Sequence, residues 1–292
     1  MKIGVVHFGW ATAGTAQIVR TLIEGLSIQE NTVYGIECNR TTKDIELKEL
    51  TKKSLAATLG SNSYVVRSVP VQYWNENALQ IADQLSTLDK VILLGGSVVN
   101  SEHLSGKLLQ VPVSIFNDVK GSQLTLGYDT ALNSIVENIE SVRDTASSLN
   151  YGKVRVFCVQ IPGNGTSKLV VNSALAVEAE IVSTASVEEI EHIKQHVKEE
   201  EIVEQGYTFL LMNEGVDPKQ LEGHFTGFDL DWRFVEIDES QLGGPYPTAL
   251  DRLIANQLKA AVLDWSLSDQ SSGHFVIQDG QVLLKCNATE PA

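Results

Sequence analysis

Glycines follow several apolar segments of this 292-residue chain, at the places where open α/β sheets bind phosphate. Gly9 follows the first such segment, Gly95 and Gly96 follow another, and Gly121 and Gly127 come after a further one. Backbone amides approach a phosphate closely where no Cβ intrudes, and the dipole of a following helix favours the anion. Glycine is also an ordinary turn residue. The pattern therefore indicates either a nucleotide-type site or plain turns.

Polar side chains within residues 114–118 could form part of a binding site. Asn117 and Asp118 stand side by side there. Side chains of Asn and Asp also fix turns by hydrogen bonding to nearby backbone. Ligand binding and turn formation are both open roles for this pair.

Two other groups of residues suggest ligands less specifically. Residues 163–168 are polar and rich in glycine, but they lack the GxxxxGK[ST] spacing of a phosphate loop. His192 and His196 stand four residues apart on an expected helix, with no cysteine or third ligand nearby. We expect a plain loop in the first case and a solvated helix face, with no metal site, in the second.

Alternating strands and helices must position all of these residues. Apolar runs bounded by turn residues predict buried strands at residues 3–7, 33–36, 90–95, 111–115, 153–160, 180–183, 207–213 and 233–237. Helical periodicity predicts helices at residues 16–26, 77–85, 130–147, 187–205 and 249–265. Such alternation predicts an α/β fold with parallel sheets flanked by helices.

The order of the elements also predicts two lobes. The helices at residues 130–147 and 187–205 bracket a separate series of strands and helices. We therefore predict a larger lobe of residues 1–138 with 251–292, and a smaller lobe of residues 139–250. The tail should end in a short strand pair that turns at Asp279 and Gly280, a dipeptide typical of hairpins.

Several segments resemble the phosphofructokinase family in order and spacing. Residues 114–133 read SIFNDVKGSQLTLGYDTALN, which resembles the family's TIDNDIPGTDxTxGFDTALN. Residues 141–148 resemble its IRDTASS helix end, residues 33–36 resemble its VYGI strand, and residues 241–252 resemble QRGGSPTAxDR with one inserted residue. The resemblance covers roughly residues 1 to 285. It implies a two-lobed fold with a nucleotide phosphate side and a sugar-phosphate side.

The resemblance places non-catalytic residues where the family carries its chemistry. Phosphoryl transfer requires a base near the attacking hydroxyl and a metal ion held by carboxylate. The first aspartate of TIDND is the base in the family, and that place is Phe116 here, so we expect no intact catalytic group. The metal-binding aspartate of the GGDGS loop corresponds to Ser97, a poor ligand for magnesium. Asp118 is the surviving carboxylate.

Both phosphate sides depart from the family pattern as well. The second glycine of the family's GGDAPGMN loop corresponds to Trp10 in this sequence. Its indole would occupy the space of the phosphates. We expect this ring to fill the vacated crevice beside Gly95 and Phe116, although a stacking platform for a flat ligand is the alternative. Leu242 replaces the arginine of QRGG, while Arg252 is retained.

The resemblance assigns five residue positions to each of the two sides. The nucleotide side corresponds to Gly9, Trp10, Gly95, Gly96 and Ser97. The sugar-phosphate side corresponds to Ser114, Asn117, Asp118, Leu242 and Arg252.

Composition excludes several classes of partner. The formal charge of −15 opposes contact with nucleic acid or an anionic membrane surface. The longest apolar runs fall well short of a membrane span, and the chain enters a strand directly after Met1, so we expect a cytoplasmic protein. Cys38, Cys158 and Cys286 show no CxxC spacing, which favours thiols over a disulfide framework or a zinc site.

Together these features predict a phosphofructokinase-like protein that has lost catalysis and acts as a binding, regulatory or partner subunit. Its expected partners are further copies of itself in a dimer or tetramer, a different protein subunit, or a small phosphorylated metabolite. No cofactor is expected. The alternative is an active ATP- or pyrophosphate-dependent sugar-phosphate kinase, for which the resemblance implies magnesium and ATP.

Overall fold

The computed structural model describes residues 1–9, 12–39, 42, 44–56, 65–95, 99–148, 152–202 and 206–286. The chain forms two compact units, one of Met1–Thr130 with Pro245–Ala292 and one of Ala131–Gly244. The lobe boundaries given by the sequence, after residues 138 and 250, stay predictions. Within the described part of the chain, no helix has the length and apolar character needed to cross a membrane.

Unit 1 is built on an eight-stranded sheet. Its main path runs β12-β11-β6-β5-β1-β2-β3, and β4 pairs with β1. All neighbours are parallel except β3 on β2 and β12 on β11. The strands are β1 (Lys2–Phe8), β2 (Thr32–Cys38), β3 (Ile45–Leu50), β4 (Ser68–Val69), β5 (Lys90–Leu94), β6 (Lys107–Val111), β11 (Gly273–Gln278) and β12 (Gln281–Cys286).

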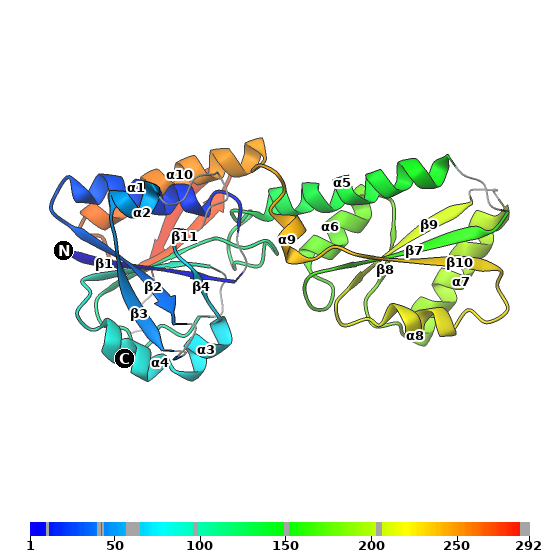
Figure 1. The fold of residues 1–292 in the computed structure, drawn as a ribbon, viewed down its shortest axis with the longest axis horizontal. Helices are drawn as coiled ribbons and strands as arrows, with labels where there is room; N and C mark the ends of the chain where they lie inside the picture. Colours follow the sequence, from blue (N-terminus) through cyan, green and yellow to red (C-terminus); the bar gives the residue numbers. More distant parts are fainter. Residues whose placement is uncertain are drawn as a thin grey trace. The chain divides into compact units, whose positions relative to one another are not determined.

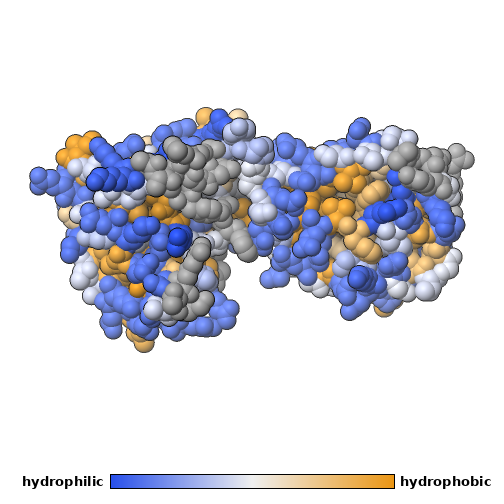
Figure 2. All heavy atoms as spheres, in the orientation of Figure 1, coloured by the Kyte–Doolittle hydropathy of each residue, from blue (hydrophilic) through white to orange (hydrophobic). Residues whose placement is uncertain are grey.

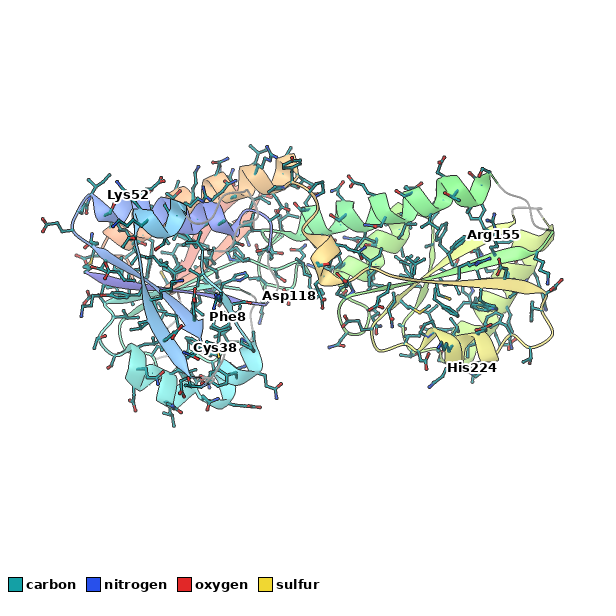
Figure 3. All side chains as sticks on the ribbon, viewed as in Figure 1. Phe8, Cys38, Lys52, Asp118, Arg155 and His224 are labelled. Atoms are coloured by element: carbon teal, nitrogen blue, oxygen red, sulfur yellow. The ribbon has the colours of Figure 1, made fainter. Side chains whose placement is uncertain are left out.

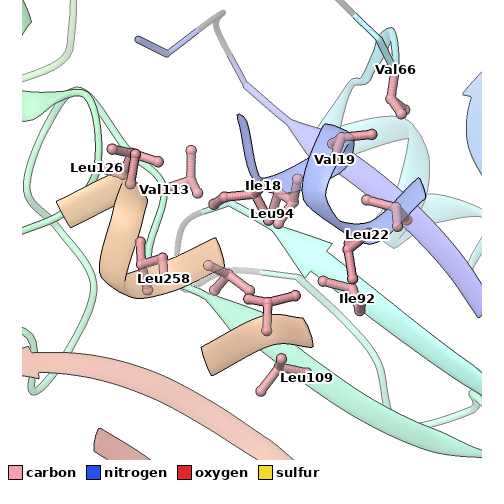
Figure 4. Close-up of a cluster of buried hydrophobic side chains, with 14 of the residues drawn as sticks. Ile18, Val19, Leu22, Val66, Ile92, Leu94, Leu109, Val113, Leu126 and Leu258 are labelled. Carbon is pink, nitrogen blue, oxygen red and sulfur yellow. The ribbon is translucent and has the colours of Figure 1, made fainter. Parts of the chain in front are cut away.

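Helices cover both faces of this sheet (Figure 1). One face carries α1 (Thr15–Ser27), α2 (Lys52–Ala56) and α10 (Ala249–Leu267), and the other carries α3 (Val71–Glu76) and α4 (Ala78–Leu85). Alternate residues of a strand point to opposite faces. In β1, Ile3 and Val5 therefore belong to the hydrophobic cluster under α1 and α10, whereas Val6 and Phe8 pack toward α3 and α4. Figure 4 shows part of the first cluster, with Ile18 and Leu22 of α1 and Leu258 of α10 labelled.

Lys90 fixes one end of α10. Its ammonium nitrogen donates to the carbonyl oxygens of Trp265 at 3.1 Å, Ser266 at 2.8 Å and Ser268 at 2.5 Å. These carbonyls lie at the carboxyl end of the helix, where the macrodipole favours a cation. Burial lowers the pKa of this amine. The first residue of β5 thus holds the end of a helix that lies far away in the sequence.

Unit 2 has a smaller, fully parallel sheet in the order β10-β7-β9-β8. Helices alternate with its strands, and each crossover contains one. The elements are α5 (Tyr128–Ser147), β7 (Val154–Ile161), α6 (Lys168–Ala176), β8 (Glu180–Val182), α7 (Val187–Ile202), β9 (Tyr207–Asn213), α8 (Pro218–Gly223), β10 (Leu230–Glu236) and α9 (Glu239–Leu242). α5 begins in unit 1 and continues into unit 2.

The predicted fold class is confirmed, since both sheets are mainly parallel and flanked by helices. The strand predicted at residues 111–115 is wrong, because the strand is β6 and ends at Val111. Pro112 lacks an N–H group and cannot continue the ladder. The chain instead bends, with Val113 N donating to Val111 O at 2.9 Å. The next residues pair with a later segment through a parallel bridge of Val113 to Leu126.

Two further comparisons with the sequence are informative. The strand pair that turns at Asp279 and Gly280 is confirmed by β11 and β12. Both turn residues have positive φ, 48° and 73°, as tight hairpins require. The prediction missed β3, because this outermost strand carries charged side chains at Glu46, Lys48 and Glu49. Charged side chains are typical of strands at the edge of a sheet.

His7 is a buried imidazole in β1, a central strand of unit 1. Only 2% of its surface is exposed, and its Nε2 atom has no hydrogen-bond partner. Burial lowers the pKa of His7 from 6.5 to about 4, because the charged form loses its hydration. The folded protein therefore holds this ring neutral at a pH where the unfolded chain would protonate it.

We predict that His7 makes the protein less stable in mild acid. Below pH 6.5 the unfolded state binds a proton, whereas His7 of the folded state stays unprotonated down to about pH 4. The free energy of unfolding therefore decreases as the pH falls across that window. The loss between about pH 7 and about pH 5 should be about 2 kcal/mol. Urea unfolding at both values should show a smaller loss for His7→Leu than for the wild type. The exposed His103→Leu change should leave the wild-type dependence intact, and equal slopes for all three proteins would contradict the prediction.

Candidate functional site

The candidate site of unit 1 starts at the carboxyl ends of β1 and β5, which are neighbours in the sheet. Gly9 follows β1 with a φ of 74°, and a Cβ built on it would meet no atom within 4 Å. Gly95 follows β5 for a different reason, since a Cβ there would lie 2.8 Å from the Cβ of Phe8. Gly9 is thus required by backbone conformation and Gly95 by close packing.

Aromatic side chains fill the sheet face beside these glycines. Phe8 (Figure 3) packs edge to face on Trp74, with ring centroids 5.0 Å apart and planes at 88°. The Trp74 indole donates to the backbone oxygen of Asn100 at 2.8 Å, and Asn75 Oδ1 accepts from Asn100 N at 2.8 Å. The chain that leaves the sheet after Gly95 is thereby held again at Asn100 by α3.

Trp10, Gly96 and Ser97 lie outside the described residues. The predicted packing of Trp10 against Phe116 and the predicted loss of a metal ligand at Ser97 therefore stay predictions. Gly9 and Gly95, which border these positions, are both described.

The turn at residues 114–118 follows β6 and brings several predicted site residues together. The Ser114 hydroxyl accepts from Phe116 N at 3.1 Å, and the Ser114 carbonyl accepts from the buried Thr125 hydroxyl at 2.7 Å. Asn117 adopts a φ of 52° and donates from Nδ2 to Gln123 O at 3.0 Å. Ser114 and Asn117 thus both have a structural role in this turn.

Asn117 nevertheless retains one unused polar atom. The residue is 5% exposed, and its Oδ1 has no protein partner. A buried acceptor without a partner costs about 1–3 kcal/mol unless an ordered water satisfies it. The positive φ of the Asn117 backbone adds strain, although asparagine tolerates this conformation better than most residues.

Phe116 and Asp118 flank Asn117 and differ in chemistry and exposure. Phe116 is half-buried and carries no group that accepts a proton. Asp118 is exposed (Figure 3). Within the described ranges, no group of three or more His, Cys, Asp or Glu side chains could hold a metal ion. A single carboxylate such as Asp118 is, by itself, a poor magnesium site.

Asp251 organises the residues behind this turn, and the sequence analysis did not single it out. It is fully buried in the first turn of α10. Its carboxylate accepts from Gly127 N at 2.8 Å, from Thr130 N at 2.8 Å and from the Thr130 hydroxyl at 2.5 Å. Burial raises the pKa of Asp251, and the bonds from Thr130 and Gly127 oppose that rise.

Thr248 closes this hydrogen-bonded group. Its hydroxyl accepts from Asp251 N at 3.3 Å and so caps α10, while its own N–H donates to the Thr130 hydroxyl at 3.1 Å. Thr130 is the last residue of unit 1 before the chain enters unit 2, and Thr248 lies just after the chain returns. The acid in a first helical turn was the available sequence signal for Asp251.

The first loop packs tightly against the same region. A Cβ on Gly127 would lie 2.6 Å from Thr12 Cβ, and a Cβ on Gly14 would lie 3.1 Å from Ala255 Cβ. The hydroxyls of Thr12 and Thr15 also hydrogen-bond each other. These glycines are required because two loops and α10 meet without space for side chains.

Arg252 is the exposed residue after Asp251. Its Nε donates to Pro247 O at 3.0 Å, so the side chain folds back over the turn that starts α10. A guanidinium has further N–H groups, which can bind a phosphate or carboxylate. Arg252 therefore remains a candidate anion contact of unit 1.

Leu242, on the sugar-phosphate side of the resemblance, belongs to unit 2. It is 2% exposed at the end of α9, so it serves as a core residue of that unit. Gly163, shortly after β7, has a φ of 115° and turns the chain away from the sheet. A leucine side chain in the core can offer no charge to a phosphate.

Loops at the carboxyl edge of the unit 2 sheet are tied together by Asn213. Its Nδ2 donates to Gly165 O at 3.1 Å and to Ser183 O at 3.4 Å, and its Oδ1 accepts from Gly215 N at 2.7 Å. Gln160 adds a bond to Val216 O at 2.9 Å. The loops after β7, β8 and β9 are therefore linked through one buried amide.

A carboxylate fills the loop after β8. Glu189 accepts from Ser183 N at 3.2 Å, Thr184 N at 3.0 Å and Ser186 N at 3.3 Å, and from two hydroxyls. Burial acts to raise the pKa of Glu189, but the Ser183 hydroxyl and these amides lower it to about 2. Sequence reasoning missed this residue, although Ser186-x-x-Glu189 is a capping-box pattern.

His192 and His196 both face Glu180 on β8. His192 Nε2 is 3.1 Å from one oxygen of that carboxylate, and His196 Nδ1 is 3.7 Å from the other. His196 Nε2 also contacts the Thr208 hydroxyl at 2.8 Å. The expected absence of a metal here stays a prediction, and the observed contacts are hydrogen bonds and close nitrogen–oxygen contacts on one side of α7.

Both units are α/β, with glycines after the carboxyl ends of parallel strands, the edge where open α/β sheets bind their ligands. A sequence model of the family described as phosphofructokinase matches residues 2–266. The chain belongs to the phosphofructokinase family.

Curated relatives agree with this assignment. The chain is 26% identical over 297 residues to the ATP-dependent 6-phosphofructokinase of Oceanobacillus iheyensis, covering 95% of this chain and 89% of that one. It is 24% identical to the ATP-dependent 6-phosphofructokinase of Aquifex aeolicus, covering 98% of this chain and 92% of that one. For the corresponding protein of Mesomycoplasma hyopneumoniae the identity is 29%, and the shares are 70% and 65%.

Solved structures share the fold. Pichia pastoris phosphofructokinase in the T-state matches with a TM-score of 0.74 and 18% identity, over 98% of this chain. This chain spans 37% of the length of that larger protein. The pyrophosphate-dependent phosphofructokinase of Marinobacter aquaeolei matches with a TM-score of 0.70 and 13% identity, over 97% of this chain and 81% of that one.

We predict that Asp251→Ala lowers the free energy of unfolding by about 2–4 kcal/mol, because it leaves buried donors at Gly127 and Thr130 without an acceptor. Chemical denaturation measures the effect. Asp264→Ala is the matched control, since Asp264 is an exposed aspartate on the same helix. Its cost should stay within about 0.5 kcal/mol. Equal costs for the two variants would show that the Asp251 bonds contribute little.

We predict that Glu189 stabilises unit 2 above its ordinary pKa of 4.5 and loses that effect as pH falls toward about 2. Glu189→Ala should cost about 1–2 kcal/mol near neutral pH. The cost should shrink by at most about 1 kcal/mol between about pH 6 and about pH 4, because solvent screens this partly exposed group. Urea unfolding of Glu188→Ala, an exposed neighbour, is the control, and a Glu189→Ala cost that grows in acid would refute the assignment.

Proposed function

We propose that this member of the phosphofructokinase family binds a ligand and regulates or completes an assembly without transferring a phosphoryl group. The observation that carries the proposal is Phe116. A half-buried aromatic side chain stands in the turn after β6 where the family resemblance puts the base. Phosphoryl transfer relies on positioned charges and a base near the attacking hydroxyl, and a phenyl ring supplies neither.

Other positions that the resemblance assigns to the site support this proposal. The Ser114 hydroxyl is engaged by the backbone of the same turn, and Asn117 is held by Gln123. Leu242 lies in the core of unit 2, where the resemblance puts a phosphate-binding arginine. Several independent groups needed for chemistry are thus replaced or committed to internal bonds.

The proposed ligand is a small phosphorylated metabolite. Gly9 provides open backbone after β1, and Arg252 presents an exposed guanidinium at the start of α10. Both features belong to unit 1. Open amides and a guanidinium suit a phosphate group, which does not depend on a catalytic base for binding.

The proposed assembly is a homo-oligomer, a dimer or tetramer, with a different family subunit as the other possible partner. Large apolar side chains are exposed in both units, with Leu253 at 62% and Leu175 at 78%. Figure 2 shows hydrophobic atoms at the surface of each unit. Apolar surface of this kind is typical of protein contacts when it is contiguous.

The second candidate function is an active sugar-phosphate kinase that uses ATP or pyrophosphate with magnesium. Two observations favour it: the exposed carboxylate of Asp118, and relatives named ATP-dependent 6-phosphofructokinase that match along nearly their whole length. Asp118 would then have to serve where the family uses more than one carboxylate.

We predict that the purified protein does not phosphorylate fructose 6-phosphate with magnesium and ATP or pyrophosphate, but that fructose 6-phosphate raises its melting temperature. A ligand selective for the folded state must raise the unfolding transition by mass action. A coupled assay and a thermal-shift titration with fructose 6-phosphate, ADP and magnesium-ATP give the two readouts. Phe116→Asp alone should restore no turnover, because other groups are missing as well.

Matched variants separate the possible outcomes. Arg252→Gln should weaken the thermal response about tenfold or more in ligand concentration, whereas Lys259→Gln, the same change of charge on α10, should not. Turnover that survives repurification and disappears in Asp118→Asn would establish the kinase instead. A melting temperature that none of the three ligands shifts would overturn the sensor role.

A further inference from the structure

The only Asn-Gly dipeptide of the chain is Asn164-Gly165, in the loop between β7 and α6. Both residues are exposed, and Gly165 has a φ of 59° with no heavy atom within 4 Å of a Cβ built on it. Gly163, on the other side of Asn164, also has positive φ, at 115°. The asparagine side chain thus stands between two glycines, in a loop open to solvent.

The Gly165 amide is available to react. No acceptor among the described residues takes a hydrogen bond from its N–H. The absence of a Cβ leaves this nitrogen unshielded and gives the backbone the freedom to approach the preceding side chain.

We propose that Asn164 is a site of spontaneous covalent modification, deamidation through a cyclic imide. The Gly165 nitrogen attacks the side-chain carbonyl carbon of Asn164, the new C–N bond closes a five-membered succinimide, and the side-chain nitrogen leaves as ammonia. Water then opens either carbonyl of the ring and yields aspartate or isoaspartate. Each event consumes one water, releases one ammonia, and requires no oxidant or second protein.

Hydrogen bonds from Asn213 hold the loop in which the modification occurs. Gly165 O accepts the bond from Asn213 Nδ2 at 3.1 Å, and Asn213 also holds the loops after β8 and β9. Isoaspartate adds a carbon to the backbone immediately before Gly165 and so shifts that carbonyl. Either product adds a negative charge at this edge of unit 2, where Glu189 is already ionised.

Asn172 is the internal comparison. It lies in the middle of α6 and is followed by Ser173, which is fully buried. A helical backbone holds the following amide in a hydrogen bond and prevents ring closure. Asn172 should therefore stay unmodified under conditions that convert Asn164.

Peptide mapping separates the two residues cleanly. Cleavage after Arg155, Lys168 and Lys194 releases residues 156–168, with Asn164 as their single asparagine, and residues 169–194, with Asn172 as theirs. The folded protein is incubated in mildly alkaline buffer, and samples are mapped by mass spectrometry over time. Conversion in peptide 156–168 should proceed at least about tenfold faster than in peptide 169–194, because only Asn164 precedes an unshielded glycine.

Three variants make the outcome decisive. Asn164→Gln should abolish conversion in that peptide, and Gly165→Ala should slow it about tenfold, because a Cβ shields the nitrogen and restricts the backbone. Asn164→Asp mimics one product and should increase hydrogen exchange in residues 163–167 relative to Asn164→Gln. Conversion of Asn164 no faster than that of Asn172, or undiminished by Gly165→Ala, would overturn the proposal.

Discussion

The buried carboxylate of Asp251 is the constraint on which the arrangement of unit 1 depends. It satisfies the amides of Gly127 and Thr130, and through Thr130 and Thr248 it joins the place where the chain leaves unit 1 to the place where it returns. A charge this deep is tolerated because several donors surround it. The turn at residues 114–118 and the first loop both pack on the segment that Asp251 holds, so the geometry of the candidate site follows from this residue.

The two ends of α10 illustrate one principle applied twice. Asp251 accepts hydrogen bonds at its amino end, and Lys90 donates to carbonyls at its carboxyl end. Each charge complements the dipole of the helix end that it occupies. In unit 2, the carboxylate of Glu189 likewise accepts hydrogen bonds from backbone amides at the start of α7. Asp251, Lys90 and Glu189 are thus engaged in hydrogen bonds within their own units.

Periodicity and turn chemistry were sufficient to predict the fold class, because buried parallel strands leave long apolar runs and the hairpin at Asp279 and Gly280 needs residues that tolerate positive φ. They failed at Pro112, where a missing N–H ends the strand inside an apolar run, and at β3, where an edge position allows charged residues. The resemblance assigned site positions to Phe116 and Leu242, and these assignments stay predictions. Asp251 and Asn213 were missed, because their partners lie far away in the sequence and only the folded chain brings them together.

Gly95 lies in a segment that resembles a family motif, but close packing alone explains why it is glycine. Its missing Cβ suggests a phosphate loop, yet the Cβ of Phe8 at 2.8 Å already excludes any larger residue, and every residue except glycine at position 8 would impose the same limit. The glycine is therefore maintained by internal fit whether or not a nucleotide ever binds. Asp251, in the second segment that matches the family, is likewise maintained by its bonds to the first. Positions of this kind are required by folding alone, so their presence records the fold and does not report on the reaction.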